Sequence, residues 1–132
     1  MKIYLAGASE EVDQVRNYMT LVRDLGHEIT HDWTELVLKQ GGNPREVSEE
    51  RQQTWCLKDI QGVAGADLLW LLLPESRNSF GAAFEFGFAY AIGAYTAVSG
   101  DWKRTIFSSC ASRRFDSHAL AFGALRSGNL KP

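Results

Sequence analysis

The stretch LLWLLLP at residues 68–74, continued by ESRNSFG at 75–81 and AAFEFGFAYAIG at 82–93, decides the fold of this chain. The unbroken apolar run at 68–73 predicts a strand that is covered on both faces, as the strands of parallel sheets usually are. The polar run at 75–79 predicts a loop, and the apolar run that follows, up to Gly93, predicts a helix. Between Arg77 and Asp101 the sequence holds a single charged residue, Glu85.

The position of Glu85 needs a physical reason. Helical spacing puts small and apolar residues on the turns next to it, so its carboxylate emerges from an apolar surface near the helix N-terminus. A lone buried carboxylate costs roughly several kcal/mol unless it is paired, protonated or facing a wet cleft. Two interpretations follow: Glu85 is a functional group in a cleft, or it is a structural partner for Arg77 or Lys58.

Strand and helix patterns alternate along the rest of the chain. The predicted strands are residues 2–6, 27–31, 68–73, 95–98 and 105–107. The predicted helices are a segment capped by Ser9 and ended by Gly26, then residues 45–65, 80–93 and 116–126, with 35–44 as a loop that holds one helical turn at most. Such alternation predicts one three-layer α/β domain over residues 1–132, with a doubly wound, mostly parallel five-stranded sheet of the Rossmann or flavodoxin type.

Composition narrows the class of protein. The chain is 45% hydrophobic and 23% charged, which is ordinary for a soluble globular domain, and a net charge of -2 gives no electrostatic case for nucleic-acid polymers or anionic membranes. Cys56 and Cys110 match no metal or redox spacing, which predicts reduced, buried thiols in a cytoplasmic protein. The scattered histidines predict no metal site.

Residues 80–98 are long enough to cross a bilayer, but their glycines and Glu85 favour a buried helix and strand over a membrane-associated protein.

Several loops are expected to meet at one place. In a sheet of this kind, ligands bind beyond the carboxyl ends of the strands. The loops at 7–9, 32–33 and 75–80 each follow a predicted strand, so we expect them to surround one cleft together with Glu85. Helix N-termini at Ser9 and near residue 80 would point N–H groups into that cleft, which suits an oxyanion. The segment GAS at 7–9 lacks the glycine spacing of a P-loop or a dinucleotide site, so we expect no cofactor.

Three short motifs occur in a fixed order along the chain. They are IYLAG at 3–7, which contains Tyr4; KDI at 58–60, which contains Asp59 and precedes AD at 66–67; and SFG at 79–81 before FEFG at 84–87. In order and spacing they resemble the nucleoside 2-deoxyribosyltransferase group, which includes the 2'-deoxynucleoside 5'-monophosphate N-glycosidases. The resemblance covers residues 2–99 and implies that Tyr4, Asp59 and Glu85 line an active site.

The implied reaction breaks the N-glycosidic bond of a 2'-deoxynucleoside or its 5'-monophosphate. Two carboxylates with separate roles are the usual solution for glycosidic bonds, and a close pair implies a covalent glycosyl-enzyme. We therefore expect Glu85 to be the nucleophile and Asp59 to orient it or the departing base and to move protons. Tyr4 would hydrogen-bond the Glu85 carboxylate or the sugar. The structural alternatives are a solvated Asp59 and a Tyr4 that only fills the core.

Position 79 bears on the acceptor of the sugar. In this family, transferases carry an aspartate six residues before the glutamate, whereas the nucleotide hydrolases carry a serine that contacts the 5'-phosphate. This chain has Ser79, which favours hydrolysis of a 5'-monophosphate by water, although the glycine-rich, arginine-bearing loop of those hydrolases is missing after Gly7. A base-exchanging transferase and a non-catalytic nucleotide-binding protein remain alternatives.

The remaining substrate contacts are expected from residues around the same cleft. Gly7, Ser9 and Gly81 would line it with Ser79, and Trp33 would stack on a base or fill the core. The resemblance also implies sites that are completed by a neighbouring subunit. We therefore expect a homodimer or larger homo-oligomer that acts on a small-molecule nucleoside or nucleotide.

Overall fold

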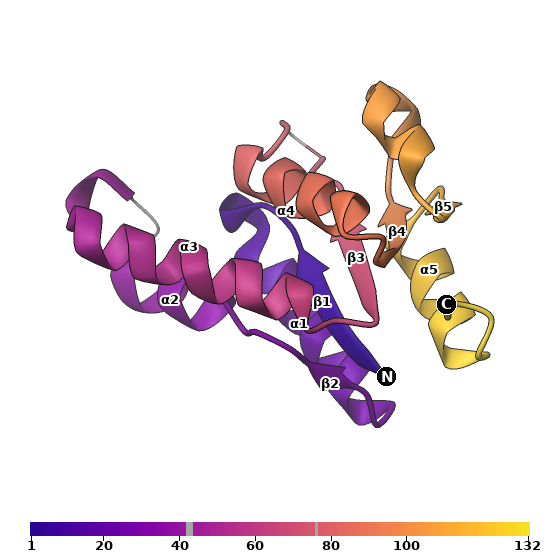
Figure 1. Ribbon diagram of the computed structural model, residues 1–132. Coiled ribbons are helices and arrows are strands. Elements are labelled where there is room, and N and C mark those ends of the chain that lie inside the picture. Colours follow the sequence, from indigo (N-terminus) through magenta and orange to yellow (C-terminus); the bar gives the residue numbers. More distant parts are fainter. Residues whose placement is uncertain (42–43, 76) are drawn as a thin grey trace.

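A five-stranded parallel sheet lies at the centre of the computed structural model, which describes residues 1–41, 44–75 and 77–132 (Figure 1). The strand order is β2-β1-β3-β4-β5, and every neighbouring pair is parallel. The strands are β1 (Lys2–Ala6), β2 (Glu28–Ile29), β3 (Leu68–Leu72), β4 (Tyr95–Ser99) and β5 (Arg113–Phe115). The predicted doubly wound α/β fold is therefore confirmed.

Helices form the two outer layers of the described structure. They are α1 (Val12–Asp24), α2 (Thr34–Gln40), α3 (Glu49–Ala64), α4 (Phe80–Ala91) and α5 (His118–Arg126). The ring of Tyr18 in α1 contacts Trp70 of β3 and Phe122 of α5, with centroid distances of 5.4 and 6.3 Å. α1 and α5 thus cover one face of the sheet, while α3 and α4 pack together over the other (Figure 1).

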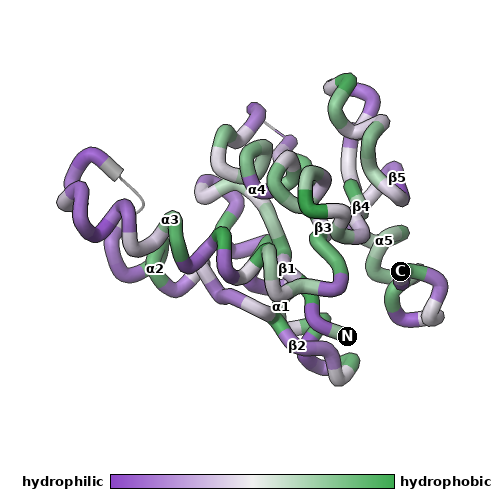
Figure 2. Tube along the Cα trace, viewed as in Figure 1, coloured by the Kyte–Doolittle hydropathy of each residue, from purple (hydrophilic) through white to green (hydrophobic). Residues whose placement is uncertain are grey.

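The core is organised around β3, in which all five residues are buried. Alternation along this strand sends Trp70 toward α1 and α5, where its Nε1 donates a 2.8 Å hydrogen bond to Ser99 Oγ, and sends Leu71 toward α4. Full burial of each large apolar side chain contributes about 1.5–3 kcal/mol. Figure 2 shows the consequence: β3 and α4 are mainly hydrophobic, whereas the start of α3 is hydrophilic. No described helix is both long and apolar enough to cross a membrane.

The segment after β2 differs from the prediction. Residues 34–40 form α2, where a loop was expected, and Gly41, with a φ of 69°, ends the helix. Leu36 and Val37 are half-buried on one side of this helix, which explains why the chain folds there. Residues 42 and 43 of the predicted turn lie outside the described residues.

The fifth strand was placed wrongly. Residues 106–110 form a 3-10 helix, η4 (Ile106–Cys110), and the strand lies later, at Arg113–Phe115. Thr105 starts the 3-10 turn because its side chain accepts a 3.4 Å hydrogen bond from the Phe107 N–H. Ile106 and Phe107 are 80% and 67% exposed, so these apolar side chains are not in the core.

Helix starts and exposed residues need further corrections. Ser9 does not cap α1: a 3-10 turn, η1 (Ser9–Glu11), comes first and α1 begins only at Val12. α3 begins at residue 49, after a second 3-10 turn, η2 (Pro44–Glu46), and the closing helix α5 begins at residue 118, after η3 (Trp102–Arg104), η4 and β5. Leu57 of α3 is 58% exposed although it is apolar. Cys56 and Cys110 are free thiols but exposed, because each lies on an outward face of its helix rather than under it.

Candidate active site

A cavity of about 340 Å³ opens at the carboxyl end of β1. Its volume falls in the range of about 300–1,000 Å³ that is usual for small-molecule sites. The loop after β1, the segment from β2 through α2, helix α3 and the first turns of α4 all contribute to it. Its lining residues are Gly7, Ser9, Trp33, Leu36, Val37, Gln40, Val47, Trp55, Asp59, Ser79, Gly81, Ala82 and Glu85.

Helix α4 carries Glu85 into this cavity. Ser79 caps the helix, since its Oγ accepts a 3.3 Å hydrogen bond from the Ala82 N–H. Glu85 follows on the second turn, and its Oε1 accepts a 2.7 Å hydrogen bond from the hydroxyl of Tyr4. Tyr4 comes from the middle of β1 and is completely buried. Its ring therefore belongs to the core, while its hydroxyl binds the Glu85 carboxyl group at the cavity.

Asp59 supplies a second carboxyl group from α3. It lines the same cavity as Glu85, and its side chain is 30% exposed. Burial raises the pKa of Asp59, and the neighbouring His31 and a hydrogen bond from Tyr4 oppose that shift. The pKa of Tyr4 is raised by burial and then by the charges of Glu85 and Asp59. The phenol is consequently a permanent donor beside the two acids.

The environment of Glu85 favours its protonated form. Burial raises the pKa of this carboxyl to about 8, the charge of Asp59 adds to the shift, and the hydrogen bond from Tyr4 opposes it. Arg77, considered as a structural partner, forms an ion pair with Glu10 instead. Lys58 lines a different, polar cavity beyond α3. The two acids and Tyr4 thus form one coupled group, as in sites where carboxyls divide acid and nucleophile roles.

An apolar wall faces the two carboxyls. Trp33 is 8% exposed, lines the cavity and donates a 2.8 Å hydrogen bond from its Nε1 to the Leu5 carbonyl. It therefore packs in the core and also forms part of the cavity wall. Sequence reasoning missed the rest of this wall, part of which lies in residues 35–44, predicted as a loop. The missed residues are Leu36, Val37, Gln40, Val47 and Trp55. The helical spacing of Leu36, Val37 and Gln40 was the available signal.

The loop residues expected to contact substrate do lie around this cavity. Gly7 and Ser9 line one side, and Ser79 and Gly81 line another. The first turn of α4 faces the cavity, but the first turn of α1 does not, because α1 starts after the lining residues of its loop. None of the described lining residues is a lysine or an arginine. Anion binding here therefore depends on α4 alone among the described elements.

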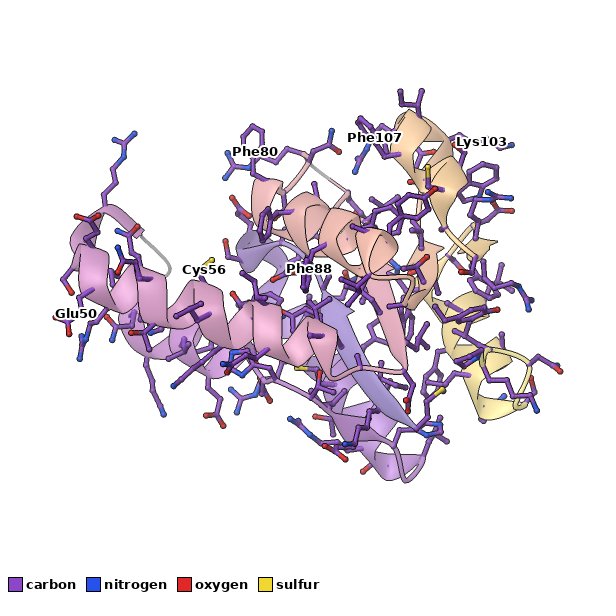
Figure 3. The ribbon with its side chains drawn as sticks, viewed as in Figure 1. Glu50, Cys56, Phe80, Phe88, Lys103 and Phe107 are labelled. Carbon is purple, nitrogen blue, oxygen red and sulfur yellow. The ribbon has the colours of Figure 1, made fainter. Side chains whose placement is uncertain are left out.

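A larger cavity of about 570 Å³ lies along another face of α4, beside residues 105–110. Phe80 and Phe107, at its rim, point outward in Figure 3. Its described lining includes no carboxylate and no histidine. No cluster of three potential metal ligands occurs among the residues that the structure describes. The two carboxyls that face each other are therefore in the smaller cavity of these two.

Comparisons with known proteins give matches in structure alone. No family model matches the chain, and no curated protein matches it in sequence. A 2-deoxyribosyltransferase from the psychrotolerant bacterium Bacillus psychrosaccharolyticus superposes with a TM-score of 0.62 and 24% identity, over 75% of this chain and 72% of that one. The CMP N-glycosidase BcmB of Clostridium botulinum superposes with a TM-score of 0.58 and 13% identity, over 95% and 98% of the two chains.

The chain shares the fold of these two enzymes. The similarity to the transferase covers about three quarters of the chain, and that to the glycosidase covers nearly all of it. The fold implied by the sequence resemblance is thereby confirmed.

Proposed function

We propose that the protein cleaves the N-glycosidic bond of a 2'-deoxynucleoside or its 5'-monophosphate, through a covalent glycosyl-Glu85 intermediate and with water as the favoured acceptor. The observation that carries this proposal is the meeting of Glu85, Asp59 and the Tyr4 hydroxyl at one cavity of suitable size. The fold shared with a 2-deoxyribosyltransferase and a CMP N-glycosidase supports the same class of reaction.

In the first step, the Glu85 carboxylate attacks C1' of the sugar. A C1'–O bond forms, the C1'–N bond breaks, and the departing nitrogen takes a proton from Asp59. Tyr4, 2.7 Å from Glu85 Oε1, stabilises the ionised carboxylate that begins this step and keeps it in one orientation. General-acid help to a leaving group typically contributes about 10²–10⁴-fold.

In the second step, water replaces the base. Its oxygen forms a bond to C1', the bond to Glu85 breaks, and Asp59 takes up the proton that water loses. Both acids return to their starting states, and the sugar keeps its configuration because C1' has been inverted twice. The Trp33 and Trp55 wall excludes bulk water and offers an apolar surface for the base.

The charges around the cavity favour a neutral nucleoside over its 5'-monophosphate. Two carboxyls line the cavity, no basic side chain is among its described lining, and Arg77 is held by Glu10. The Ser79 hydroxyl and the first turn of α4 are the contacts that would receive a phosphate. We expect a higher kcat/KM for deoxynucleosides than for their monophosphates, measured side by side with purified protein.

Base exchange is the second candidate, and the apolar wall is the observation that favours it. A free base held against Trp33 and Trp55 could attack the glycosyl-enzyme in place of water. Base release that stays constant while a second base is added, with no new nucleoside formed, would argue for hydrolysis. Formation of the new nucleoside would establish transfer.

The central test is a panel of deoxynucleosides and their monophosphates, with and without a second base, followed by chromatography. Wild type should release base, and Glu85→Gln should release none while folding normally. Glu50→Gln is the matched control, because Glu50 is exposed at the far end of α3 (Figure 3). Acid-quenched wild type should carry a sugar adduct on the peptide that contains Glu85. Turnover by Glu85→Gln equal to that of wild type would refute the assignment.

A homo-oligomer is part of the same proposal. Leu57 of α3 and Phe84 of α4 are 58% and 57% exposed, and Ile92 beyond α4 is 48% exposed. α3 and α4 lie against each other, and Phe88 and Cys56 lie on these two helices (Figure 3). Large apolar side chains gathered on neighbouring helices are typical of a protein interface. A second copy of this chain docking there would cover them next to the cavity.

A further inference from the structure

His31 lies behind Asp59, on the side of α3 that faces the sheet. It lies two residues after β2, and the pairing with β1 continues through a 3.0 Å hydrogen bond from the Thr30 N–H to the Ile3 carbonyl. His31 Nε2 is 3.3 Å from Asp59 Oδ1. Both atoms are buried, and neither forms a hydrogen bond with any described residue, so the 3.3 Å contact between them is a charge contact and not a hydrogen bond. Each is therefore the natural partner of the other.

Gly62 sets the distance between α3 and these groups. It lies one turn after Asp59 and is buried. A Cβ at residue 62 would be 2.7 Å from the His31 Cβ and 2.9 Å from the Tyr4 Cε2, closer than side-chain atoms can approach. α3 can consequently run close enough to β1 and β2 for Asp59 to reach both Tyr4 and His31.

The imidazole also connects two separate cavities. Asp59 lines the candidate active site, whereas His31 lines a polar cavity of about 280 Å³ on the other side of α3. The charged or titratable residues near the ring, from the elements packed around it, are Lys2, Tyr4, Glu28, Lys58 and Asp59. The ring can therefore exchange its proton with solvent while substrate fills the active site.

We propose that His31 is a positioning residue for Asp59: it holds the Asp59 carboxyl toward the cavity and stabilises the carboxylate that remains once the departing base has taken its proton. This inference rests on the function proposed above. No additional proton is consumed, since Asp59 regains its proton from water in the second step. Burial raises the pKa of Asp59, and the charge of His31 opposes that shift, which agrees with this role.

The kinetic test compares His31→Gln with His27→Gln, a matched change in a histidine that lies before β2 and away from the cavity. His31→Gln should lower kcat by about 10–100-fold, the usual loss when a residue that orients a functional group is removed, with little change in KM. His27→Gln should match wild type. Equal kcat for wild type and His31→Gln would overturn the proposal.

Chemical rescue separates positioning from a structural role. Because His31 lines an open polar cavity, added imidazole can enter the space left in His31→Ala and should restore part of kcat. A folded His31→Ala protein that stays inactive in imidazole would contradict the inference.

A readout without turnover makes failure of this inference distinct from failure of the proposed function. In the carboxyl ¹³C spectrum, the pKa of Asp59 should be higher in His31→Gln than in wild type, because a positive neighbour is lost. An unchanged pKa would overturn the proposal even in an inactive protein. Inactive wild type with the expected shift would refute the glycosidase function and leave the His31–Asp59 coupling standing.

Gly62→Ala tests the spacing itself. The added Cβ must push α3 away from Tyr4 and His31, so kcat should fall although alanine is the better helix former. Gly87→Ala in α4 is the matched control, because a Cβ there meets nothing within 4 Å. Gly62→Ala with the kcat of Gly87→Ala would contradict the close approach on which the inference depends.

Discussion

Replacing Tyr4 by phenylalanine should move the pH dependence of the reaction without disrupting the fold. The ring stays in its fully buried place in β1, and the interactions of the hydroxyl disappear: the 2.7 Å hydrogen bond to Glu85 Oε1, and the hydrogen bond that lowers the pKa of Asp59. A hydrogen bond to a charged group contributes about 1.5–3 kcal/mol. Since one pKa unit corresponds to about 1.36 kcal/mol, the loss should raise the pKa of Glu85 by roughly one to two units.

The pKa of Glu85 in wild type determines how large the effect of Tyr4→Phe on the rate should be. With a pKa of about 8, Glu85 is ionised in roughly a tenth of the free wild-type molecules at neutral pH. The limb of the kcat/KM profile that reports ionisation of Glu85 should therefore have its midpoint near pH 8, and loss of the proton that Asp59 gives to the base sets the opposite limb. In Tyr4→Phe the Glu85 limb should lie roughly one to two units higher, so kcat/KM at neutral pH should fall about 10–100-fold.

The assay is base release at several substrate concentrations from about pH 5 to about pH 10. Tyr18→Phe is the matched control, because Tyr18 lies in α1 on the opposite face of the sheet. Its profile should coincide with that of wild type. A Tyr4→Phe profile that falls in height but keeps its midpoint would refute the argument, since it would show that Tyr4 does not control the ionisation of Glu85.

Other consequences concern stability and assembly. The pKa of Glu85 is higher in the folded protein than in the unfolded chain. The stability that this group contributes is therefore full below about pH 4.5 and is lost as the pH rises through about 8. Glu85→Gln should consequently have a higher Tm than wild type, with a larger difference at alkaline than at acid pH. Burial lowers the pKa of His118, so wild type should lose stability as the pH falls below about 6.5, and His118→Gln should lose less, as thermal unfolding would show. Phe84→Glu should yield monomers in sedimentation, whereas Glu50→Gln should not; a monomeric wild type would contradict the interface.

The central strand and Glu85 could be predicted because their signals are local. An unbroken apolar run indicates a strand that is buried on both faces. A single acidic residue on an apolar helix can likewise be recognised without any knowledge of its partners. The placement of Asp59 opposite Glu85 came from the resemblance, since the residues around Asp59 carry no comparable contrast. Asp59 is partly buried and lines the cavity, and its role there stays a prediction.

The elements that were missed have weak or non-local signals. α2 has seven residues and no side-chain cap, and its apolar residues Leu36 and Val37 are only half-buried and line a cavity. β5 has three residues, of which Arg113 and Arg114 are exposed, and only its pairing with β4 makes it a strand. The apolar run at 105–107 attracted the strand prediction, but hydrophobicity alone cannot distinguish a core strand from an exposed 3-10 turn.

The contact between His31 and Asp59 could not be predicted from the sequence. Nothing in the local pattern of either residue links them, because the contact exists through the absence of a side chain at a third position, Gly62. A helical glycine ordinarily weakens its helix, so its presence in α3 is a cost that must be offset elsewhere. Here the close approach of α3 to Tyr4 and His31 offsets it. Gly62 is thus a sign of this contact in the sequence, but it can be interpreted only once the positions of α3 and the sheet are known.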